Sequence, residues 1–331
     1  MSYVIPGKNP IMMSKEILLK DAKNHGYKPE IYEKVFHLLS ILEQIMAVPY
    51  LEKRLVLKGG TALNLFCFDQ VPRMSVDIDL NYIGELDRNK MLEERILINQ
   101  GIHKILESNQ FELSRNPNHH AGGKMVWRYP SLLGQKGNLE IDLNYMYRQP
   151  LWPVIHHKPK ISFKETSYNI PVLDIHELAA GKLAALFSRN VSRDLFDAHH
   201  LLVIQNLDKE KVRIAFVIYL SMTDVDLDHL QSETIDFNII DIRNRLLPVF
   251  RQKELPRNTL ALKQWSTKLT NELKEGLKVL LPLNPNEIDY ILNIRKFGKI
   301  LPELITSDKK LACNIESHPA IRWRVEKSKK Q

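Results

Sequence analysis

Residues 57–81 read LKGGTALNLFCFDQVPRMSVDIDLN, and this stretch decides the fold. Two adjacent glycines, Gly59 and Gly60, follow a mostly apolar run at residues 54–58 and precede Thr61 and a short apolar segment. This order predicts a strand, a tight turn at the glycines and a helix that begins at Thr61. A glycine turn before a helix N-terminus exposes backbone N–H groups and leaves room for a phosphate group. The first half of the stretch therefore predicts a phosphate-binding turn.

The second half of the stretch carries two aspartates, Asp77 and Asp79, in a β-like run at residues 76–80. In a strand, side chains two residues apart point to the same face, so these two carboxylates would lie side by side. Two carboxylates this close repel each other unless a proton, solvent or a cation compensates them, and hard oxygen ligands suit Mg²⁺ or Mn²⁺. A phosphate-binding turn beside a metal-binding carboxylate pair indicates nucleotide chemistry.

These motifs resemble a known family. Gly-Gly-Thr followed by Asp-x-Asp on a strand looks like the signature of the nucleotidyltransferase fold shared by DNA polymerase beta and tRNA nucleotidyltransferases. The particular form at residues 57–65 and 75–80 is similar to the AbiEii/AbiGii toxin family, the toxin half of AbiE-type and MenT-type toxin–antitoxin systems. The resemblance covers roughly residues 50–205. It implies an α/β (α+β) fold, with a small mixed sheet flanked by helices and a helical C-terminal domain.

The chain departs from the wider family at two places. Most members have Gly-Ser where this chain has Gly60 and Thr61, and either hydroxyl can contact a phosphate. The gap between Thr61 and Asp77 is also longer than in the most compact members. By resemblance, Gly59, Gly60 and Thr61 are expected to hold phosphates, and Asp77 and Asp79 to bind the metal.

A third carboxylate is expected on a later strand. Residues 138–146 alternate polar and apolar side chains, so Glu140, Asp142 and Asn144 share one face of a predicted strand. Asp142 fits the apolar-Asp-apolar pattern of the family, which implies that it binds metal or helps to deprotonate the acceptor, and Glu140 is the weaker candidate. The alternative is that these polar groups are the solvated face of an edge strand.

A predicted helix at residues 175–189, with Asp174 as its N-cap, carries a lysine among small residues. The small neighbours favour close packing of this helix, with the Lys182 ammonium reaching outward. The resemblance implies that Lys182 is a catalytic residue that binds the triphosphate, and that Arg189 also contacts the nucleotide. A merely solvent-exposed lysine is the alternative.

The segment Arg193-Asp-Leu-Phe-Asp197 matches the family's Arg-Asp-x-x-Asp pattern. The resemblance implies that its aspartates lie near the active site, with Asp194 favoured as the catalytic one and Asp197 as the alternate, in contact with the nucleotide. Ser192 or Asp194 could cap the helix that begins here, and Arg193 and Asp197 have the spacing of a structural ion pair.

The chain of 331 residues is long enough for two domains and a substantial core. We expect N-terminal helices at 1–48 that pack on the catalytic lobe, a nucleotidyltransferase domain at 49–172, and a helical C-terminal domain with a basic tail at 173–331. Within the second domain, glycine turns are predicted at 122–123 and 134–137. Residues 147–172 have the composition of a proline-rich linker with one short extended segment, in which His156 and His157 are expected on the surface.

Composition limits the class of protein further. No segment reaches the about 18 uninterrupted apolar residues of a membrane helix and no signal peptide begins the chain, so a cytoplasmic location is expected. The two cysteines give neither a disulfide framework nor a zinc pattern. The net charge of +8 favours a polyanionic partner, and the last ten residues, RWRVEKSKKQ, could follow a nucleic-acid backbone or be solvated disorder. The acidic run DVDLDH at 224–229 lacks the EF-hand glycine and glutamate and is expected to be a solvated turn.

The resemblance implies a toxin of a phage-defence or abortive-infection system. It would move NMP from an NTP to an acceptor hydroxyl, with the 3′ end of tRNA as the expected acceptor, and so block translation until an antitoxin encoded nearby reverses the effect. The rival interpretation is a non-catalytic nucleotide- or RNA-binding module of the same fold that acts through a partner. A metal-dependent glycosyltransferase also uses Asp-x-Asp, but it would need a longer nucleotide-binding unit before that motif.

Overall fold

The computed structural model describes residues 13–116, 122–161, 163 and 169–329. The chain forms two compact units. The first comprises Met1–Arg148, Val154–Val172 and Val249–Glu254, and the second comprises Gln149–Pro153, Leu173–Pro248 and Leu255–Gln331.

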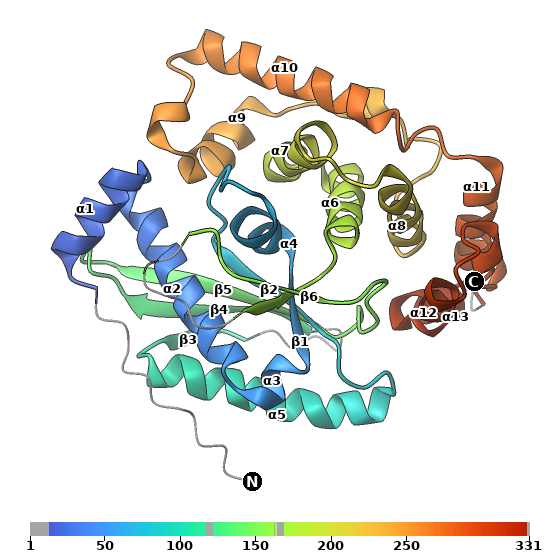
Figure 1. Ribbon diagram of the computed structural model, residues 1–331, viewed down its shortest axis with the longest axis horizontal. Helices are drawn as coiled ribbons and strands as arrows, with labels where there is room; N and C mark the ends of the chain where they lie inside the picture. Colours follow the sequence, from blue (N-terminus) through green and yellow to red (C-terminus); the bar gives the residue numbers. More distant parts are fainter. Residues whose placement is uncertain (1–12, 117–121, 162, 164–168, 330–331) are drawn as a thin grey trace. The chain divides into compact units, whose positions relative to one another are not determined.

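The first unit is built on a seven-stranded mixed sheet with the order β3-β4-β5-β2-β1-β7-β6 (Figure 1). The pairs β2–β5 and β1–β7 are parallel and the remaining neighbours are antiparallel. The predicted mixed sheet flanked by helices is thus confirmed. The strands are β1 Leu55–Lys58, β2 Asp77–Tyr82, β3 Glu112–Arg115, β4 Gly122–Pro130, β5 Lys136–Asn144, β6 Ile155–His157 and β7 Ile170–Val172. The helices are α1 Lys15–His25, α2 Pro29–Met46, α3 Pro49–Glu52, α4 Gly59–Ala62 continued by the π-helical turn η1 Leu63–Cys67, and α5 Arg88–Ser108.

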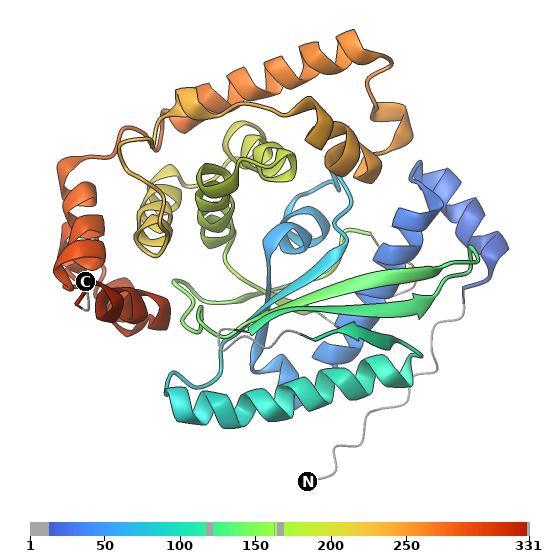
Figure 2. The same cartoon turned by 180° about the vertical axis from the view of Figure 1, so that it is seen from behind.

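Helices α2 and α5 cover one face of this sheet. His37 of α2 lies against Tyr129 of β4, with ring centroids 4.2 Å apart, and His103 of α5 meets Trp127 of the same strand edge-on at 4.9 Å. These strands present apolar side chains to α2 and α5 at every second position. Burial of these side chains stabilises the packing of the two helices on the sheet. Figures 1 and 2 show α4 on the opposite side of the sheet from α5. The polar side chains of β2 and β5 alternate with the apolar ones and so lie on the second face, on the side of α4.

Three sequence predictions for this unit were wrong in detail. The helix after β1 begins at Gly59 and not at Thr61. Gly122 and Gly123 do not form a turn; they are the first residues of β4 and pair with Asn144 and Leu143. Gly137 likewise belongs to β5.

The predicted linker at 147–172 also needs correction. Its described residues include β6 and β7, which extend the sheet beyond β1. The prolines misled the prediction, although a proline is tolerated in edge positions of a sheet, and Pro171 lies within β7. His156 is exposed on β6, where its Nε2 lies 3.3 Å from Glu52 Oε1.

The second unit is helical. Its α-helices and longer π-helical turns are α6 Ile175–Arg189, α7 Ser192–His199, η2 His200–Ile204, α8 Lys209–Ser221, α9 Ile239–Asp241, η4 Ile242–Leu246, α10 Thr259–Leu277, α11 Pro285–Leu292, η7 Asn293–Phe297, α12 Lys309–Ser317 and α13 Pro319–Ser328. Two helices, α12 and α13, close the chain, and the described part of the basic tail is helical rather than disordered. Among the residues that the structure describes, no helix has the length and apolar character needed to span a bilayer.

Candidate functional site

The glycine turn joins β1 directly to a helix start. Gly59 is the first residue of α4 and has a φ of +73°, in the left-handed region that favours glycine. A Cβ atom at Gly59 would overlap the Oδ2 atom of Asp79, so only glycine lets the backbone approach this carboxylate so closely. The side chain of the N-cap residue, Lys58, makes no capping hydrogen bond to α4. The N–H groups at the start of a helix favour an anion, and the Lys58 side chain does not occupy that place.

Thr61 has a different role from the predicted one. Its side chain is fully buried, and its hydroxyl donates a 2.5 Å hydrogen bond to the backbone carbonyl of Asp77. The hydroxyl thus fastens α4 to the first residue of β2, and this geometry does not support the phosphate contact predicted for it. Asn64 similarly donates its side-chain amide to the carbonyl of Gly60 at 3.0 Å.

Four carboxylates share one face of two neighbouring strands. In the parallel register of β2 and β5, Asp77 lies opposite Glu140 and Asp79 lies opposite Asp142. Since side chains two residues apart share a face, all four belong to the same face, which we call the carboxylate face. The expected meeting of Asp77, Asp79 and Asp142 on adjacent strands is therefore present in the fold. β5 lies inside the sheet between β4 and β2, so these groups are not on an edge strand.

Lysines border the carboxylate face. Lys58 at the end of β1 lies opposite Asp79 in the antiparallel register, and Lys124 of β4 lies opposite Asp142. The Lys124 ammonium is 2.6 Å from Glu140 Oε2. Lys34 of α2 places its ammonium 3.9 Å from Asp77 Oδ1.

The electrostatics of Asp77 indicate crowding of negative charge. Burial is the main cause that raises the pKa of Asp77 above its ordinary value. The neighbouring charges of Lys34 and Lys124 lower this pKa, whereas those of Glu140 and Asp79 raise it. Asp77 is thus a carboxylate that would gain from an additional cation.

The donor set fits a divalent metal only in part. Within the described residues, no three His, Cys, Asp or Glu side chains already form a metal-binding group. Mg²⁺, however, is usually held by one or two carboxylates together with substrate phosphates and waters. Asp77 and Asp79, adjacent on one strand face and beside an uncapped helix start, match that requirement.

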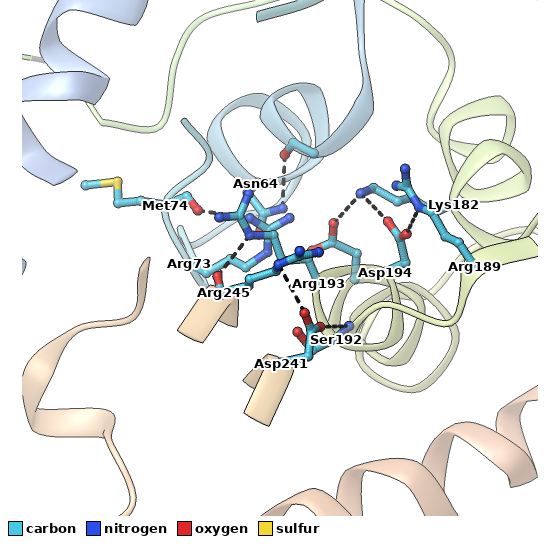
Figure 3. A network of polar contacts seen from close by, with 12 residues as sticks. Asn64, Arg73, Met74, Lys182, Arg189, Ser192, Arg193, Asp194, Asp241 and Arg245 are labelled. Carbon is cyan, nitrogen blue, oxygen red and sulfur yellow. Dashed lines mark hydrogen bonds and ion pairs between the residues drawn. The ribbon is translucent and has the colours of Figure 1, made fainter. Parts of the chain in front are cut away.

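The second unit contains a separate charged cluster formed by Lys182, Arg189, Asp194 and Asp197 (Figure 3). The Lys182 ammonium lies 2.9 Å from Asp194 Oδ1 and 2.9 Å from Asp197 Oδ2. The Arg189 Nε lies 2.6 Å from Asp194 Oδ2. We call this set the Lys182 cluster. It joins α6 to α7 within the second unit.

Burial makes the Lys182 cluster interdependent. Asp194 and Asp197 are fully buried, and the Lys182 side chain is only 12% exposed. Burial alone would raise the pKa of Asp194, but the charges of Lys182 and Arg189 hold it below its ordinary value. The prediction that the Lys182 ammonium reaches outward was wrong, because two buried carboxylates hold it.

Capping at the start of α7 also differs from the prediction. Neither Ser192 nor Asp194 caps this helix; its N-cap is Val191, which has no capping side chain among the described residues. Instead, Asp241 accepts a 2.8 Å hydrogen bond from the backbone N–H of Ser192 (Figure 3). Arg193 donates to the carbonyl of Arg245 at 2.9 Å.

Comparison with known proteins places these features in a family. Residues 40–292 match the family described as "Nucleotidyl transferase AbiEii toxin, Type IV TA system", which is more than half of the chain. The chain belongs to the AbiEii nucleotidyltransferase toxin family. It is therefore a toxin of a type IV toxin–antitoxin system, and an antitoxin is its expected partner.

The fold of this AbiEii-family chain is similar to that of a solved toxin. MenT4, a nucleotidyltransferase toxin from Mycobacterium tuberculosis H37Rv, has 16% sequence identity and a TM-score of 0.59. The similarity covers 94% of this chain and 99% of that chain. At this identity the likeness shows the fold alone. No curated protein matches the sequence.

Several residues near the AbiEii-family motifs escaped the sequence analysis. Lys34 and Lys124 approach the carboxylate face from α2 and β4, and only the strand pairing and helix packing reveal this. The alternation of β4 could have placed Lys124 on a polar face, but not beside Glu140. Asp241 lies 49 residues after Ser192 and had no local signal.

Proposed function

We propose that this toxin is an NTP-dependent nucleotidyltransferase that moves NMP to an acceptor hydroxyl with release of pyrophosphate. One observation carries the proposal. The glycine start of α4 lies against Asp79 of β2, so a helix N-terminus and a carboxylate pair that are far apart in the sequence lie side by side. This juxtaposition suits a nucleotide whose phosphates bind both N–H groups and a carboxylate-held cation.

Each residue of the first unit has a role in this proposal. The N–H groups of Gly59 and Gly60 would bind phosphate oxygens, and Thr61 would keep that turn fixed to β2. Asp77 and Asp79 would hold Mg²⁺ or Mn²⁺. When bound, such a metal neutralises phosphate charge and stabilises the in-line displacement.

Asp142 and Glu140 complete the carboxylate face. Asp142, opposite Asp79 in the register, would contribute to the metal site or accept the proton of the acceptor hydroxyl at its carboxylate. Glu140 holds Lys124 and has the less direct role.

The Lys182 cluster is proposed to support the same reaction. Lys182 is predicted to bind the triphosphate with Arg189, with Asp194 as a catalytic residue and Asp197 as its alternate. In the described state both aspartates pair with Lys182, so a triphosphate contact would require the ammonium to exchange one carboxylate for a phosphate oxygen. The exposed Arg189 side chain is the more accessible of the two cations.

The acceptor is proposed to be RNA, namely the 3′ end of tRNA. The net charge of +8 favours a polyanionic acceptor, and modification of tRNA would explain toxicity through blocked translation. The antitoxin would reverse this effect, the setting would be antiviral defence, and the protein would act in the cytoplasm.

A transfer assay tests the proposal. The wild type and Asp77→Asn would each be incubated with the four α-³²P-labelled NTPs, Mg²⁺ and total cellular RNA and protein. We expect label from one NTP on a tRNA-sized band. The label should be absent with the variant, and also absent with wild type when no metal is added. Glu326→Gln, an exposed carboxylate of α13, is the matched control and should transfer normally.

Two other outcomes would redirect the proposal. Label on protein would keep the enzyme class and replace the acceptor. No label with any NTP, together with growth arrest that persists in Asp77→Asn, would favour the non-catalytic binding module.

A further inference from the structure

Two lysines reach the carboxylate face from elements that carry none of its carboxylates. Lys34 comes from α2 and lies near Asp77, and Lys124 comes from β4 and contacts Glu140. Asp77 and Glu140 are opposite each other in the register of β2 and β5. The two ammonium groups therefore approach a single pair of opposed carboxylates, Asp77 and Glu140.

The two ion pairs differ in length and exposure. The Lys34 contact, at 3.9 Å, is at the outer limit of an ion pair, and the Lys124 side chain is 47% exposed. Exposed ion pairs contribute little to stability, because water screens them and holding two flexible side chains costs entropy. Lys124 can therefore exchange its present partner for a stronger one at little cost, and the long Lys34–Asp77 contact leaves the Lys34 ammonium within reach of a further anion.

The charge balance of the face gives a reason for such an exchange. Among the described side chains on this face and at its border, the four carboxylates outnumber the lysines by one; the lysines are Lys34, Lys58 and Lys124. One divalent cation held by the carboxylates would turn the face net positive and would compete with the lysines for carboxylate oxygens. Ammonium groups displaced in this way would lie at the rim of the site, where a triphosphate brings a high density of anionic oxygens.

We propose that Lys34 and Lys124 bind the phosphate groups of the nucleotide. They rest on Asp77 and Glu140 in the free protein and transfer to phosphate oxygens when the metal and the nucleotide bind. A lysine suits this task, since its ammonium is a compact charge on a flexible stem. The inference rests on the proposed function, and it adds phosphate ligands that the family motifs do not include.

A simpler role for the lysines predicts different behaviour. If they only offset repulsion among the carboxylates, their removal would strengthen metal binding and leave nucleotide binding at saturating metal unchanged. If they bind phosphate, their removal weakens nucleotide binding even at saturating metal.

The test measures binding, without turnover. Calorimetric titration of the full-length protein at saturating Mg²⁺ would use the α,β-methylene analogues of ATP, CTP, GTP and UTP, with Mg²⁺ alone titrated in parallel. For the analogue that wild type binds, we expect Lys34→Gln and Lys124→Gln each to raise the Kd about tenfold or more, the loss of one charge-assisted contact. Lys124→Arg should recover most of the affinity.

Lys136→Gln is the matched control. Lys136 of β5 also pairs with a glutamate, Glu112 of β3, but it lies six residues before Asp142, about 20 Å away along the strand. The Kd of the Lys136→Gln variant for the nucleotide analogue should equal that of wild type. Circular dichroism would confirm that each variant is folded.

Two results would overturn the inference in distinguishable ways. A nucleotide Kd within twofold of wild type in both Gln variants, with tighter binding of Mg²⁺, would assign the lysines to charge compensation only. If wild type binds none of the four analogues, the proposed function itself fails, and the inference fails with it.

Discussion

Glu177 gives the sharpest prediction about stability. This residue of α6 is 2% exposed, and its carboxyl group accepts hydrogen bonds from the backbone N–H of Leu151 at 2.9 Å and from the hydroxyl of Tyr219 at 3.1 Å. Burial nevertheless dominates and raises the pKa of Glu177 to about 8. Glu177 is therefore protonated in the folded protein at neutral pH.

The sign of the pH effect follows from this pKa. In the unfolded chain the carboxyl ionises near its ordinary value of 4.5, whereas in the folded chain it keeps its proton to about pH 8. Between these two values the folded state binds more protons, so the free energy of unfolding falls as pH rises. The slope is about 1.4 kcal/mol per pH unit, which gives an upper limit of about 5 kcal/mol over the whole window.

Glu177→Gln should remove this pH dependence. Glutamine has the shape of a protonated glutamate: its carbonyl can accept from Leu151, and its amide can donate to the Tyr219 oxygen. Urea unfolding, followed by tryptophan fluorescence at pH 5.5 and pH 8.5, would measure both proteins. We expect similar stability at pH 5.5 and a more stable variant at pH 8.5, by about 2–4 kcal/mol.

The exposed Glu326→Gln serves as the control and should follow wild type at both pH values. Trp152 follows Leu151 in sequence, so the fluorescence signal reports on the region of the change. Equal pH dependence in wild type and Glu177→Gln would refute the assignment of a buried, protonated carboxyl.

Three further substitutions test the site. Gly59→Ala should abolish transfer and lower stability, whereas Gly134→Ala, also at positive φ but with no atom within 4 Å of the added Cβ, should lose only the backbone cost of about 1 kcal/mol. Comparison of the two by urea unfolding and labelled-NTP transfer separates overlap with the carboxylate from backbone strain. Lys182→Met should cost about 3–5 kcal/mol, because it leaves buried carboxylates without their main cation; a loss under about 1 kcal/mol would contradict the buried arrangement. Thr61→Val should lower the unfolding free energy by about 1–2 kcal/mol, since it leaves the carbonyl of Asp77 without its donor, and calorimetric melting would measure it.

The sequence was informative where local chemistry decides the structure. The period-2 pattern of residues 76–80 and 138–146 placed Asp77, Asp79 and Asp142 on strands, and their shared face follows from that period. The family motif then supplied what spacing alone cannot, namely that the two strands are neighbours. Asp174 was predicted as the N-cap of α6, and its side chain does accept the backbone N–H of His176.

Tertiary contacts decided the rest. The Lys182 ammonium was expected to point outward, but α7 brings two buried carboxylates to it from more than ten residues away. Gly122 and Gly123 look like turn residues in sequence, yet their pairing with β5 makes them strand. Residues 147–172 have a linker composition, and only their pairing with β1 reveals β7. In each case the long-range contact, and not the local propensity of the residues, decided the structure.

The bond between Thr61 and the Asp77 carbonyl has a consequence for how this chain tolerates change. The hydrogen bond joins the residues at the two ends of the connection between α4 and β2. Strand pairing with β1 and β5 fixes the register of β2 independently. The entropy of closing such a loop grows only slowly with its length, at about 0.6 kcal/mol per doubling. An insertion is therefore expected to be tolerated at the exposed residues Asp69 and Gln70, while the carboxylates keep their places. Residues 73–76 are buried, and the Met74 N–H donates to the carbonyl of Val249 at 2.8 Å, so their length is fixed by packing.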